Sequence, residues 1–333
     1  MKRLLLKLTV LLALISAAQI IKYVSNGGDR KFLPVEIKAY REVLAKNPDI
    51  VLLSDSVNTS WAPADQSKAP ISDMLAALLP DRRLGSVDHA AYHPRLYLSF
   101  LKNMIARGTR PLVVVHVNMR SFSTGWHSNP GWQFAKLRVL LDNDHFLFRA
   151  FFKPLAIFKA FSLDPISKTA FDQMPVKDGD VAIGQIKDFE APMYAGGSDE
   201  AIKNKLIYNY MYALTPDHSF VASLKEMARV AKEKNTPILF YITPVDVATG
   251  EKYLGPHFRQ RLKDNIDVIR SALAAHQTAL IDLSESVPSA DFDWLKDRTP
   301  NEHLNERGRR FVAAQIAAKI AIENKGEIAT LKP

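Results

Sequence analysis

The chain has 333 residues, of which 47% are hydrophobic and 24% are charged, and its formal net charge is +9. Such a composition is typical of a globular protein with a large core. The absence of cysteine excludes disulfides, thiolate catalysis and cysteine-based zinc sites. The excess of basic residues is typical either of a solvated surface or of a protein that is attracted to acidic lipids and anionic envelope polymers. Nucleic acid is not an expected partner, because no Lys/Arg stripe is interleaved with aromatic residues.

The N-terminal segment has the pattern of an export signal. Met1 to Arg3 is basic, and Leu4 to Ile21 is mostly apolar. Ser16 to Ala18 offers small residues for cleavage, whereas Ile20 to Val24 extends the apolar stretch towards a bilayer-spanning length. We therefore assign residues 1–24 to a signal peptide or membrane anchor, favour the anchor, and expect export to the cell envelope or periplasm.

A linker and a leading helix, Leu33 to Ala45, are expected within residues 25–46, before the first strand. That strand, Ile50 to Leu53, is an apolar run that suits a parallel sheet covered on both faces. Ser56 follows at the point where the strand ends and the next helix begins. A hydroxyl in this position can meet an activating base, although most Asp-Ser pairs after a strand are caps or turns.

Further elements alternate along the chain. The expected helices are Ile71–Leu79, Leu96–Ala106, Phe220–Lys234 and Phe258–His276, and the expected strands are Pro111–Val115, Pro237–Ile242 and Ala279–Leu283. This alternation favours a parallel sheet with helices on both faces.

The alternation fails between about residues 122 and 215, which we interpret as an insertion or cap. Its first part holds Trp126 and His127, which either contact substrate or anchor the loop to the core. A phenylalanine-rich stretch follows, from His145 to Leu163. Its helical spacing suits core packing, a membrane-surface helix or the cover of an acyl-chain site.

His303 lies in the loop before a final helix that includes Phe311 to Ile320. The carboxyl ends of parallel strands meet at one edge of a sheet, where open α/β folds bind ligands. Ser56 and His303 are therefore expected to share this edge despite their separation in sequence.

The chain resembles the SGNH (GDSL-type) hydrolase superfamily, including its envelope-anchored esterase and O-acyltransferase branches. The first family block, Gly-Asp-Ser, corresponds to Ser54-Asp55-Ser56, and the third, Gly-x-Asn, to His116-Val117-Asn118. The second block falls between Arg83 and His93, where Gly85 is the only glycine. The last, Asp-x-x-His, corresponds to Pro300 to His303. The resemblance implies a three-layer α/β/α flavodoxin-like sandwich with a central parallel sheet and a helical insertion.

The resemblance also implies roles for individual residues. Ser56 is the expected nucleophile and His303 the base. Ser56, Gly85 and Asn118 are the expected oxyanion hole. Pro300 stands where the family has its acid, so Asp297, the nearest acid upstream, becomes the candidate that orients His303. Glu302 adjoins His303, but neighbouring side chains diverge. The candidate substrate contacts are Asp55, His116, Trp126 and His127.

These observations predict a serine-dependent ester hydrolase or O-acyltransferase that acts on acylated carbohydrate of the envelope or another ester. Its SGNH-like domain would span residues 47–325, followed by a tail at 326–333. No cofactor or metal is expected. Replacement of three family residues, by Ser54, His116 and Pro300, keeps open an inactive module that binds a glycan or a partner. The oligomeric state is left open.

Overall fold

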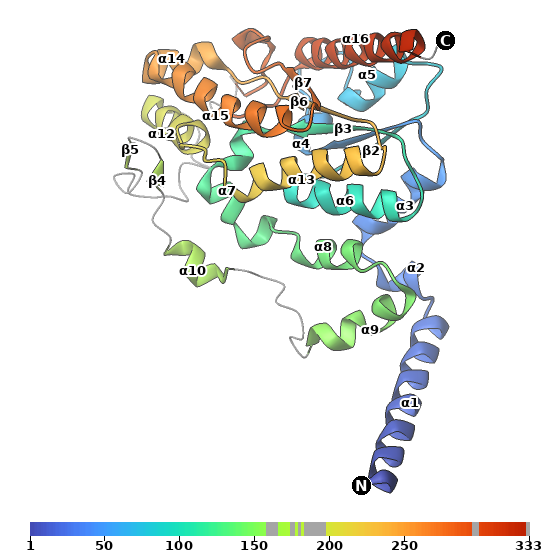
Figure 1. Ribbon diagram of the computed structural model, residues 1–333. Helices are drawn as coiled ribbons and strands as arrows, with labels where there is room; N and C mark the ends of the chain where they lie inside the picture. The colour runs from blue at the N-terminus through green and yellow to red at the C-terminus, as the bar shows by residue number, and fades with distance from the viewer. Residues whose placement is uncertain (158–165, 174–176, 179–180, 183–197, 295–299, 331–333) are drawn as a thin grey trace.

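The computed structural model describes residues 1–157, 166–173, 177–178, 181–182, 198–294 and 300–330. Its centre is a parallel sheet in the order β2-β1-β3-β6-β7 (Figure 1). The strands are β1 (Ile50–Ser54), β2 (Leu84–Asp88), β3 (Leu112–Val117), β6 (Ile238–Ile242) and β7 (Ala279–Asp282). This is the flavodoxin-like strand order, whose direction of winding reverses between β1 and β3. The predicted fold class is confirmed.

Helices cover both faces of the sheet. One face packs against α3 (Val35–Ala45), α6 (Pro94–Ala106), α13 (Ser219–Glu233) and α15 (His257–Ala274). The other packs against α5 (Ile71–Leu78) and α16 (Glu306–Thr330). Alternate residues of β1 enter the two cores, with Val51 and Leu53 on one side and Ile50 and Leu52 on the other. The apolar run of β1 is thus explained by burial on both faces.

The expected boundaries of most elements hold to within a few residues, but β2 differs. No strand is predicted between Arg83 and His93, where the second family block is expected, whereas Leu84–Asp88 pairs with β1 as an edge strand. Two further helices connect neighbouring strands: the short α4 (Ser56–Thr59) follows β1, and α14 (Val247–Leu254) follows β6. A 3₁₀ turn, η4 (Ser289–Asp291), lies between β7 and α16.

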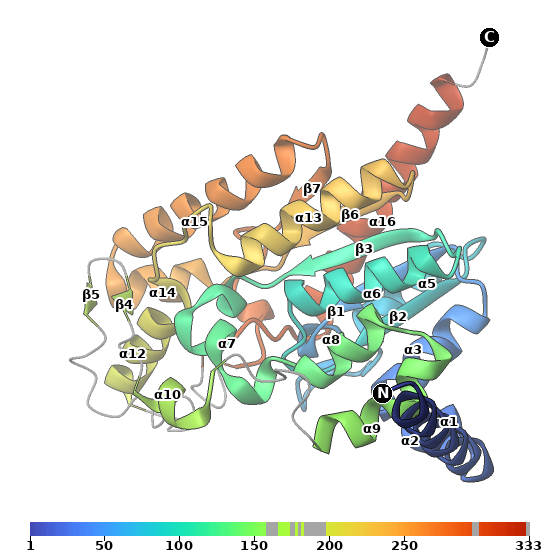
Figure 2. The ribbon, with the colours of Figure 1, turned by 60° about the horizontal axis from the view of Figure 1, so that its bottom comes forward.

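The segment between β3 and α13 is mainly helical. It contains η1 (Met119–Phe122), α7 (Thr124–Ser128), η2 (Pro130–Trp132), α8 (Ala135–Asp142), α9 (Phe146–Ile157), α10 (Lys168–Asp172) and α12 (Asp199–Tyr210). A two-stranded antiparallel sheet of β4 (Lys177–Asp178) and β5 (Val181–Ala182) accompanies them. Figure 2 shows α7, α10 and α12 at one end of the main sheet, and α9 beside α8 and the end of α1.

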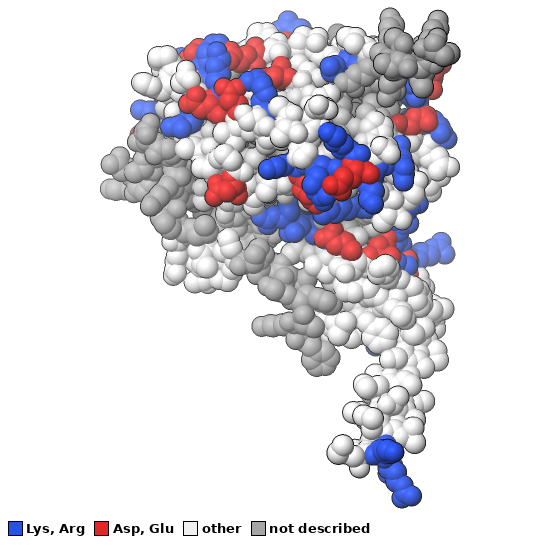
Figure 3. Space-filling model, in the orientation of Figure 1, with Lys and Arg blue, Asp and Glu red and all other residues white. Residues whose placement is uncertain are grey.

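The N-terminal helix α1 (Lys2–Ser25) protrudes from the domain, and the short α2 (Asp29–Phe32) joins it to α3 (Figure 1). Among the described residues, α1 is the one helix with the length and apolar composition needed to cross a membrane. Its most apolar window is not buried against the rest of the protein. Figure 3 shows this rod as an uncharged surface with lysine and arginine near its free end.

Candidate active site

Ser56 is placed by the end of β1 and the start of α4. Asp55 caps this short helix, because its Oδ1 atom accepts a hydrogen bond of 2.9 Å from the Val57 N–H. The cap turns the chain sharply after the strand and leaves Ser56 half-buried at the carboxyl edge of the sheet. Its Oγ atom lies 3.0 Å from Nε2 of His303, although the two residues are 247 positions apart. The predicted meeting of these two side chains is therefore observed.

The backbone around His303 is held from both sides. The His303 N–H donates to Oδ1 of Asn301 at 2.8 Å, and the His303 carbonyl accepts from the Asp293 N–H at 3.0 Å. Leu304 forms an isolated bridge with Phe292. These contacts direct the imidazole towards Ser56. No carboxylate among the described residues is hydrogen-bonded to the His303 ring, and Asp297 lies outside the described residues.

Asn118 joins three segments that lie far apart in sequence. Its Nδ2 atom donates to Oδ2 of Asp55 at 2.8 Å and to Oε1 of Glu302 at 2.7 Å. Its Oδ1 atom accepts from the Arg120 N–H at 3.0 Å. Both amide hydrogens are thus used inside the protein. In this arrangement Asn118 ties the Ser56 and His303 loops together, and it presents no free N–H for the expected oxyanion hole.

The expected role of Gly85 is wrong. The register pairs Val51 with Gly85 and Ser54 with Asp88, so Gly85 lies near the amino end of β2, away from the edge that carries Ser56. A Cβ atom there would approach Val43 of α3 to 2.4 Å. Gly85 therefore allows α3 to pack closely on the sheet.

The loop after β2 holds a different residue with unusual backbone geometry, Ala91, whose φ is +65°. A glycine would adopt this left-handed conformation with less strain. The second block predicted between Arg83 and His93 includes Ala91, but the residue chosen from it was its one glycine, Gly85. A non-glycine residue with positive φ has no signal in the sequence.

A buried ion pair lies beneath the Ser56–His303 site, and it was not predicted from the sequence. The Glu302 side chain is fully buried, and its Oε1 atom lies 2.5 Å from Nη2 of Arg120. The Arg120 guanidinium also lies over the Trp126 ring, 4.1 Å from its centre. Glu302 faces away from the imidazole of His303, as the divergence of neighbouring side chains predicts. In the sequence, the one indication of this ion pair is that Arg120 follows shortly after the end of β3, at Val117.

Asp55 and His116 are not substrate contacts in this structure, because each is only 1% exposed. Nδ1 of His116 lies 3.6 Å from Oδ1 of Asp55, beneath the Ser56 loop. Burial lowers the pKa of His116, an effect that the nearby carboxylates of Asp55 and Glu302 oppose only in part. A neutral imidazole therefore fills this position, and the two expected contacts are corrected to packing beneath the nucleophile.

Trp126 and His127 lie on α7, beside the Arg120–Glu302 pair. Trp126 is half-buried and its ring packs 4.1 Å from that of Trp132. His127 is held by its Nδ1 atom, 3.0 Å from the Ser123 carbonyl, and its ring packs against His218. Burial lowers the pKa of His127. Both side chains thus anchor the loop, and contact of either with substrate stays a prediction.

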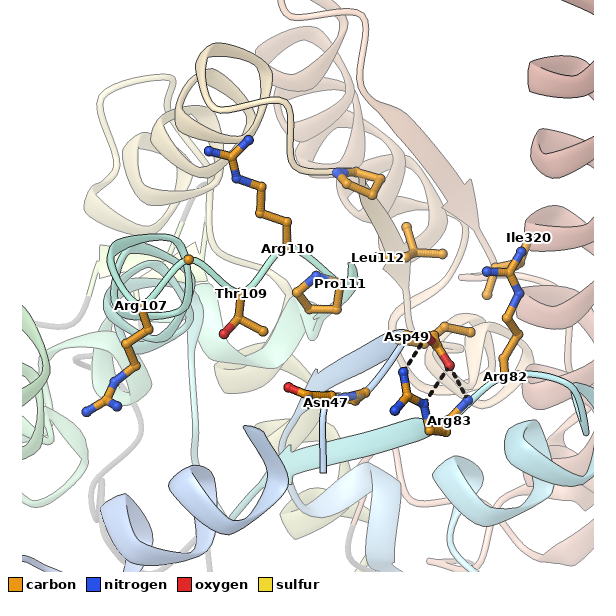
Figure 4. A pocket seen from close by; sticks show the side chains of 14 residues that line it. Asn47, Asp49, Arg82, Arg83, Arg107, Thr109, Arg110, Pro111, Leu112 and Ile320 are labelled. Carbon is orange, nitrogen blue, oxygen red and sulfur yellow. Dashed lines mark hydrogen bonds and ion pairs between the residues drawn. The ribbon is translucent and has the colours of Figure 1, made fainter. Parts of the chain in front are cut away.

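A pocket of about 660 Å³ lies at the opposite edge of the sheet (Figure 4). Ile50 and Leu112, the first residues of β1 and β3, line it, so it is separated from Ser56 by the length of β1. Asp49 is held there by Arg83, whose hydrogen bonds lower the carboxyl pKa to about 2. The lining contains several arginines but none of the residues of the Ser56–His303 site.

Metal chemistry finds no support in the arrangement of ligands. Within the described ranges, no group of three or more histidine, aspartate or glutamate side chains is placed to hold a metal ion.

No family model and no curated protein matches the chain. Solved structures that it resembles include a lipase/acylhydrolase from Enterococcus faecalis, at 12% identity and a TM-score of 0.38, which aligns over 81% of this chain and 94% of its own. Another is a catalytic mutant of an acetylxylan esterase from Geobacillus stearothermophilus, at 12% identity, a TM-score of 0.41 and coverage of 82% and 94%. A GDSL-like lipase from Bacteroides thetaiotaomicron has 10% identity, a TM-score of 0.38 and coverage of 87% and 98%.

Proposed function

We propose that the chain is a serine ester hydrolase of the SGNH type. The observation that carries the proposal is the 3.0 Å contact between Oγ of Ser56 and Nε2 of His303. A hydroxyl within hydrogen-bonding distance of an imidazole is the arrangement that nucleophilic acyl chemistry requires. The parallel sheet in flavodoxin-like order supports this assignment, since both groups lie at the edge where such folds bind ligands.

The reaction begins when His303 accepts the Ser56 proton as the oxygen attacks the carbonyl carbon of the ester. The tetrahedral intermediate collapses as His303 returns the proton to the departing alcohol, which leaves an acyl group on Ser56. His303 then activates water, which releases the acid and restores the serine. If a carbohydrate hydroxyl replaces water, the same steps give an O-acyltransferase.

The oxyanion of this reaction needs hydrogen-bond donors. The Ser56 backbone N–H belongs to the nucleophile's own residue and is the first proposed donor. Asn118 can serve as a second only if one of its bonds, to Asp55 or to Glu302, is exchanged for the oxyanion. We therefore propose that Asn118 mainly joins the Ser56 and His303 loops. It donates to the oxyanion only when one of these two bonds is released.

Acyl esters of carbohydrate are the proposed substrate class. The half-buried Trp126 lies beside the Arg120–Glu302 pair, and because its ring already packs against Arg120 and Trp132, a sugar could meet only the part of the ring that they leave exposed. The N-terminal helix supports a location where envelope carbohydrate is accessible. We propose that α1 is an uncleaved anchor that holds the domain outside the membrane, with Lys2 and Arg3 on the inner side.

A second candidate is an inactive binding module of the same fold. Two observations favour it: no described carboxylate is bonded to the His303 ring, and both amide hydrogens of Asn118 are occupied. Such a module would keep the fold and lack turnover.

A fluorophosphonate probe distinguishes the two candidates, because it reacts covalently only with an activated serine. We expect the intact protein to be labelled and Ser56→Ala to be unlabelled, with hydrolysis of an aryl acetate reduced about 1,000-fold or more. His303→Ala should also lose labelling. Ser60→Ala is the matched control, since Ser60 follows the same short helix and has no contact with His303.

Absence of labelling in folded protein, judged by circular dichroism, would overturn the catalytic proposal and leave the binding module. If labelling occurs, products formed from an acetylated glycan and a second sugar separate hydrolysis from transfer. Free acetate marks a hydrolase, and a new sugar ester marks a transferase.

A further inference from the structure

The helix α9 is attached to the outer end of the N-terminal helix. Nε2 of Gln19 on α1 donates a hydrogen bond of 2.6 Å to the Ala150 carbonyl of α9. The Tyr23 ring packs edge-on against Phe146, with 5.9 Å between ring centres. Figures 1 and 2 both show α9 beside the end of α1 that joins the domain. The position of α9 is thus coupled to that of α1.

Ion pairs make this junction stiff. The Asp29 carboxylate accepts from the Tyr23 hydroxyl, from Arg41 at 2.6 Å and from Arg149 of α9 at 2.9 Å. Asp144 accepts from the same two arginines, at 2.7 Å and 2.6 Å. Burial alone would raise the pKa of Asp29, but these hydrogen bonds outweigh it and the pKa is lowered. The end of α1, the start of the domain and α9 are therefore held as one unit.

The helix α9 buries part of its apolar surface and leaves part of it exposed. Phe148 and Phe152 pack on the domain core, and Phe152 is only 3% exposed. Phe146, Leu147 and Leu155 are 45%, 60% and 37% exposed. A helix that is apolar nearly all round is usually buried, so these exposed side chains indicate an apolar partner that the described part of the chain does not fully supply.

The length of α1 sets the depth in the bilayer at which the exposed side chains of α9 would lie. A hydrocarbon core of about 30 Å takes up about 20 helical residues. If Leu4 marks the inner boundary, the outer boundary falls near Tyr23, within about one turn of the Gln19 contact with α9. Lys153 of α9, whose Nζ lies 4.5 Å from the centre of the Phe32 ring, places a cation at the same level. Cations at this depth suit lipid headgroups.

We propose that α9 lies in the outer interface of the bilayer, with Phe146, Leu147 and Leu155 inserted among the lipids. If α1 crosses the membrane, it places these side chains of α9 against the lipid surface, and lipid is therefore their proposed partner. The inference rests on the proposed anchor role of α1, and it is independent of the chemistry at Ser56.

Spin labels on single introduced cysteines test it, because the chain has no cysteine of its own. Three exposed leucines give matched sites: Leu147 on α9 at 60%, Leu12 on α1 at 56%, and Leu78 on α5 at 50%. The full chain is placed in phosphatidylcholine nanodiscs with a fraction of phosphatidylglycerol. Collision with oxygen, which concentrates in lipid, is compared with collision with a water-soluble nickel chelate.

We expect Leu12→Cys to show the highest ratio of oxygen to nickel collisions and Leu147→Cys a ratio at least several-fold above that of Leu78→Cys. Leu155→Cys should behave like Leu147→Cys. If Leu12→Cys is deep and Leu147→Cys matches Leu78→Cys, the anchor stands and the surface role of α9 is overturned. If Leu12→Cys is itself as exposed to nickel as Leu78→Cys, the anchor fails and the inference fails with it. Fluorophosphonate labelling of the same samples reports separately on Ser56.

Discussion

Glu302 is the side chain beneath the site on which most of the local charge balance depends. It is fully buried, and its Oε1 atom is shared by Arg120 and Asn118. Removal of one partner of a buried ion pair leaves the other charge uncompensated in a medium of low dielectric constant. The neighbouring Asn118 would also lose an acceptor.

Glu302→Gln tests this dependence at nearly constant shape. We expect the free energy of unfolding to fall by about 3–5 kcal/mol, because Arg120 is left without its carboxylate. Urea denaturation measures the change. Glu285→Gln is the control, since its carboxylate pairs with Arg259 at the surface and exposed pairs contribute about 1 kcal/mol or less. Equal losses in the two variants would contradict a special role for Glu302.

The candidate site shows how far single residues can be predicted from sequence. The contact of Ser56 with His303 follows from strand order, because Ser56 follows β1, the loop of His303 connects β7 to α16, and both strands end at the same edge. The partners of Asn118 do not follow, since Asp55 and Glu302 come from distant segments and the choice among donors depends on packing. Arg120 was missed for the same reason.

At the scale of elements, the buried strands carry a strong signal and the edge strand carries a weak one. The core strands β1, β3 and β6 are apolar runs that need burial on both faces. The edge strand β2 has the sequence Leu-Gly-Ser-Val-Asp and is mostly half-exposed, so it lacks any such run. That exposure explains why no strand is predicted here; Gly85 was assigned to the site because it is the only glycine of the expected second block.

A buried guanidinium joins the loop after α4 to the last helix. Arg309 is fully buried and bonds to Oδ2 of Asp65 at 2.8 Å, to the Ser67 carbonyl at 2.7 Å and to the Ala69 carbonyl at 3.1 Å. It also donates to the Leu304 carbonyl at 2.9 Å. Arg309 thus holds the loop after α4 against the His303 loop, in addition to the link that Asn118 makes.

Arg309→Met is expected to lower the free energy of unfolding by about 3 kcal/mol or more, because the Asp65 charge and three carbonyls lose a buried donor. Arg310→Met is the matched control in the next position. Its side chain is 61% exposed and pairs with Glu306, so the expected loss is about 0.5 kcal/mol. Thermal and urea unfolding measure both. A similar small effect in the two variants would show that the loop is held by other contacts.

At the scale of the whole molecule, buried histidines predict sensitivity to acid. Burial, with smaller effects from Arg95 and Arg138, lowers the pKa of His93 from 6.5 to about 3. Burial likewise lowers the pKa of His218 to about 3, assisted by His127. Both rings pack against Phe220 of α13 and stay neutral in the folded protein.

The unfolded chain takes up these protons first, between about pH 6.5 and pH 3, so the free energy of unfolding falls as the pH falls through this window. Each histidine contributes a slope of up to about 1.4 kcal/mol per pH unit. Urea midpoints at about pH 7 and about pH 4.5 measure it. We expect His93→Phe to be less sensitive to acid than the parent, and the exposed His257→Phe to match the parent. An unchanged slope in His93→Phe would contradict neutral burial of this ring.

Arg309 and Asp65 connect positions 244 residues apart in a chain without cysteine. The link encloses most of the polypeptide, as a long-range disulfide would, but no electron transfer makes or breaks it. A thiol reductant has no bond to attack here, so the distance between Ser56 and His303 should be indifferent to redox potential. The same geometry could form in the reducing interior of a cell and persist in an oxidising compartment without an oxidative folding step.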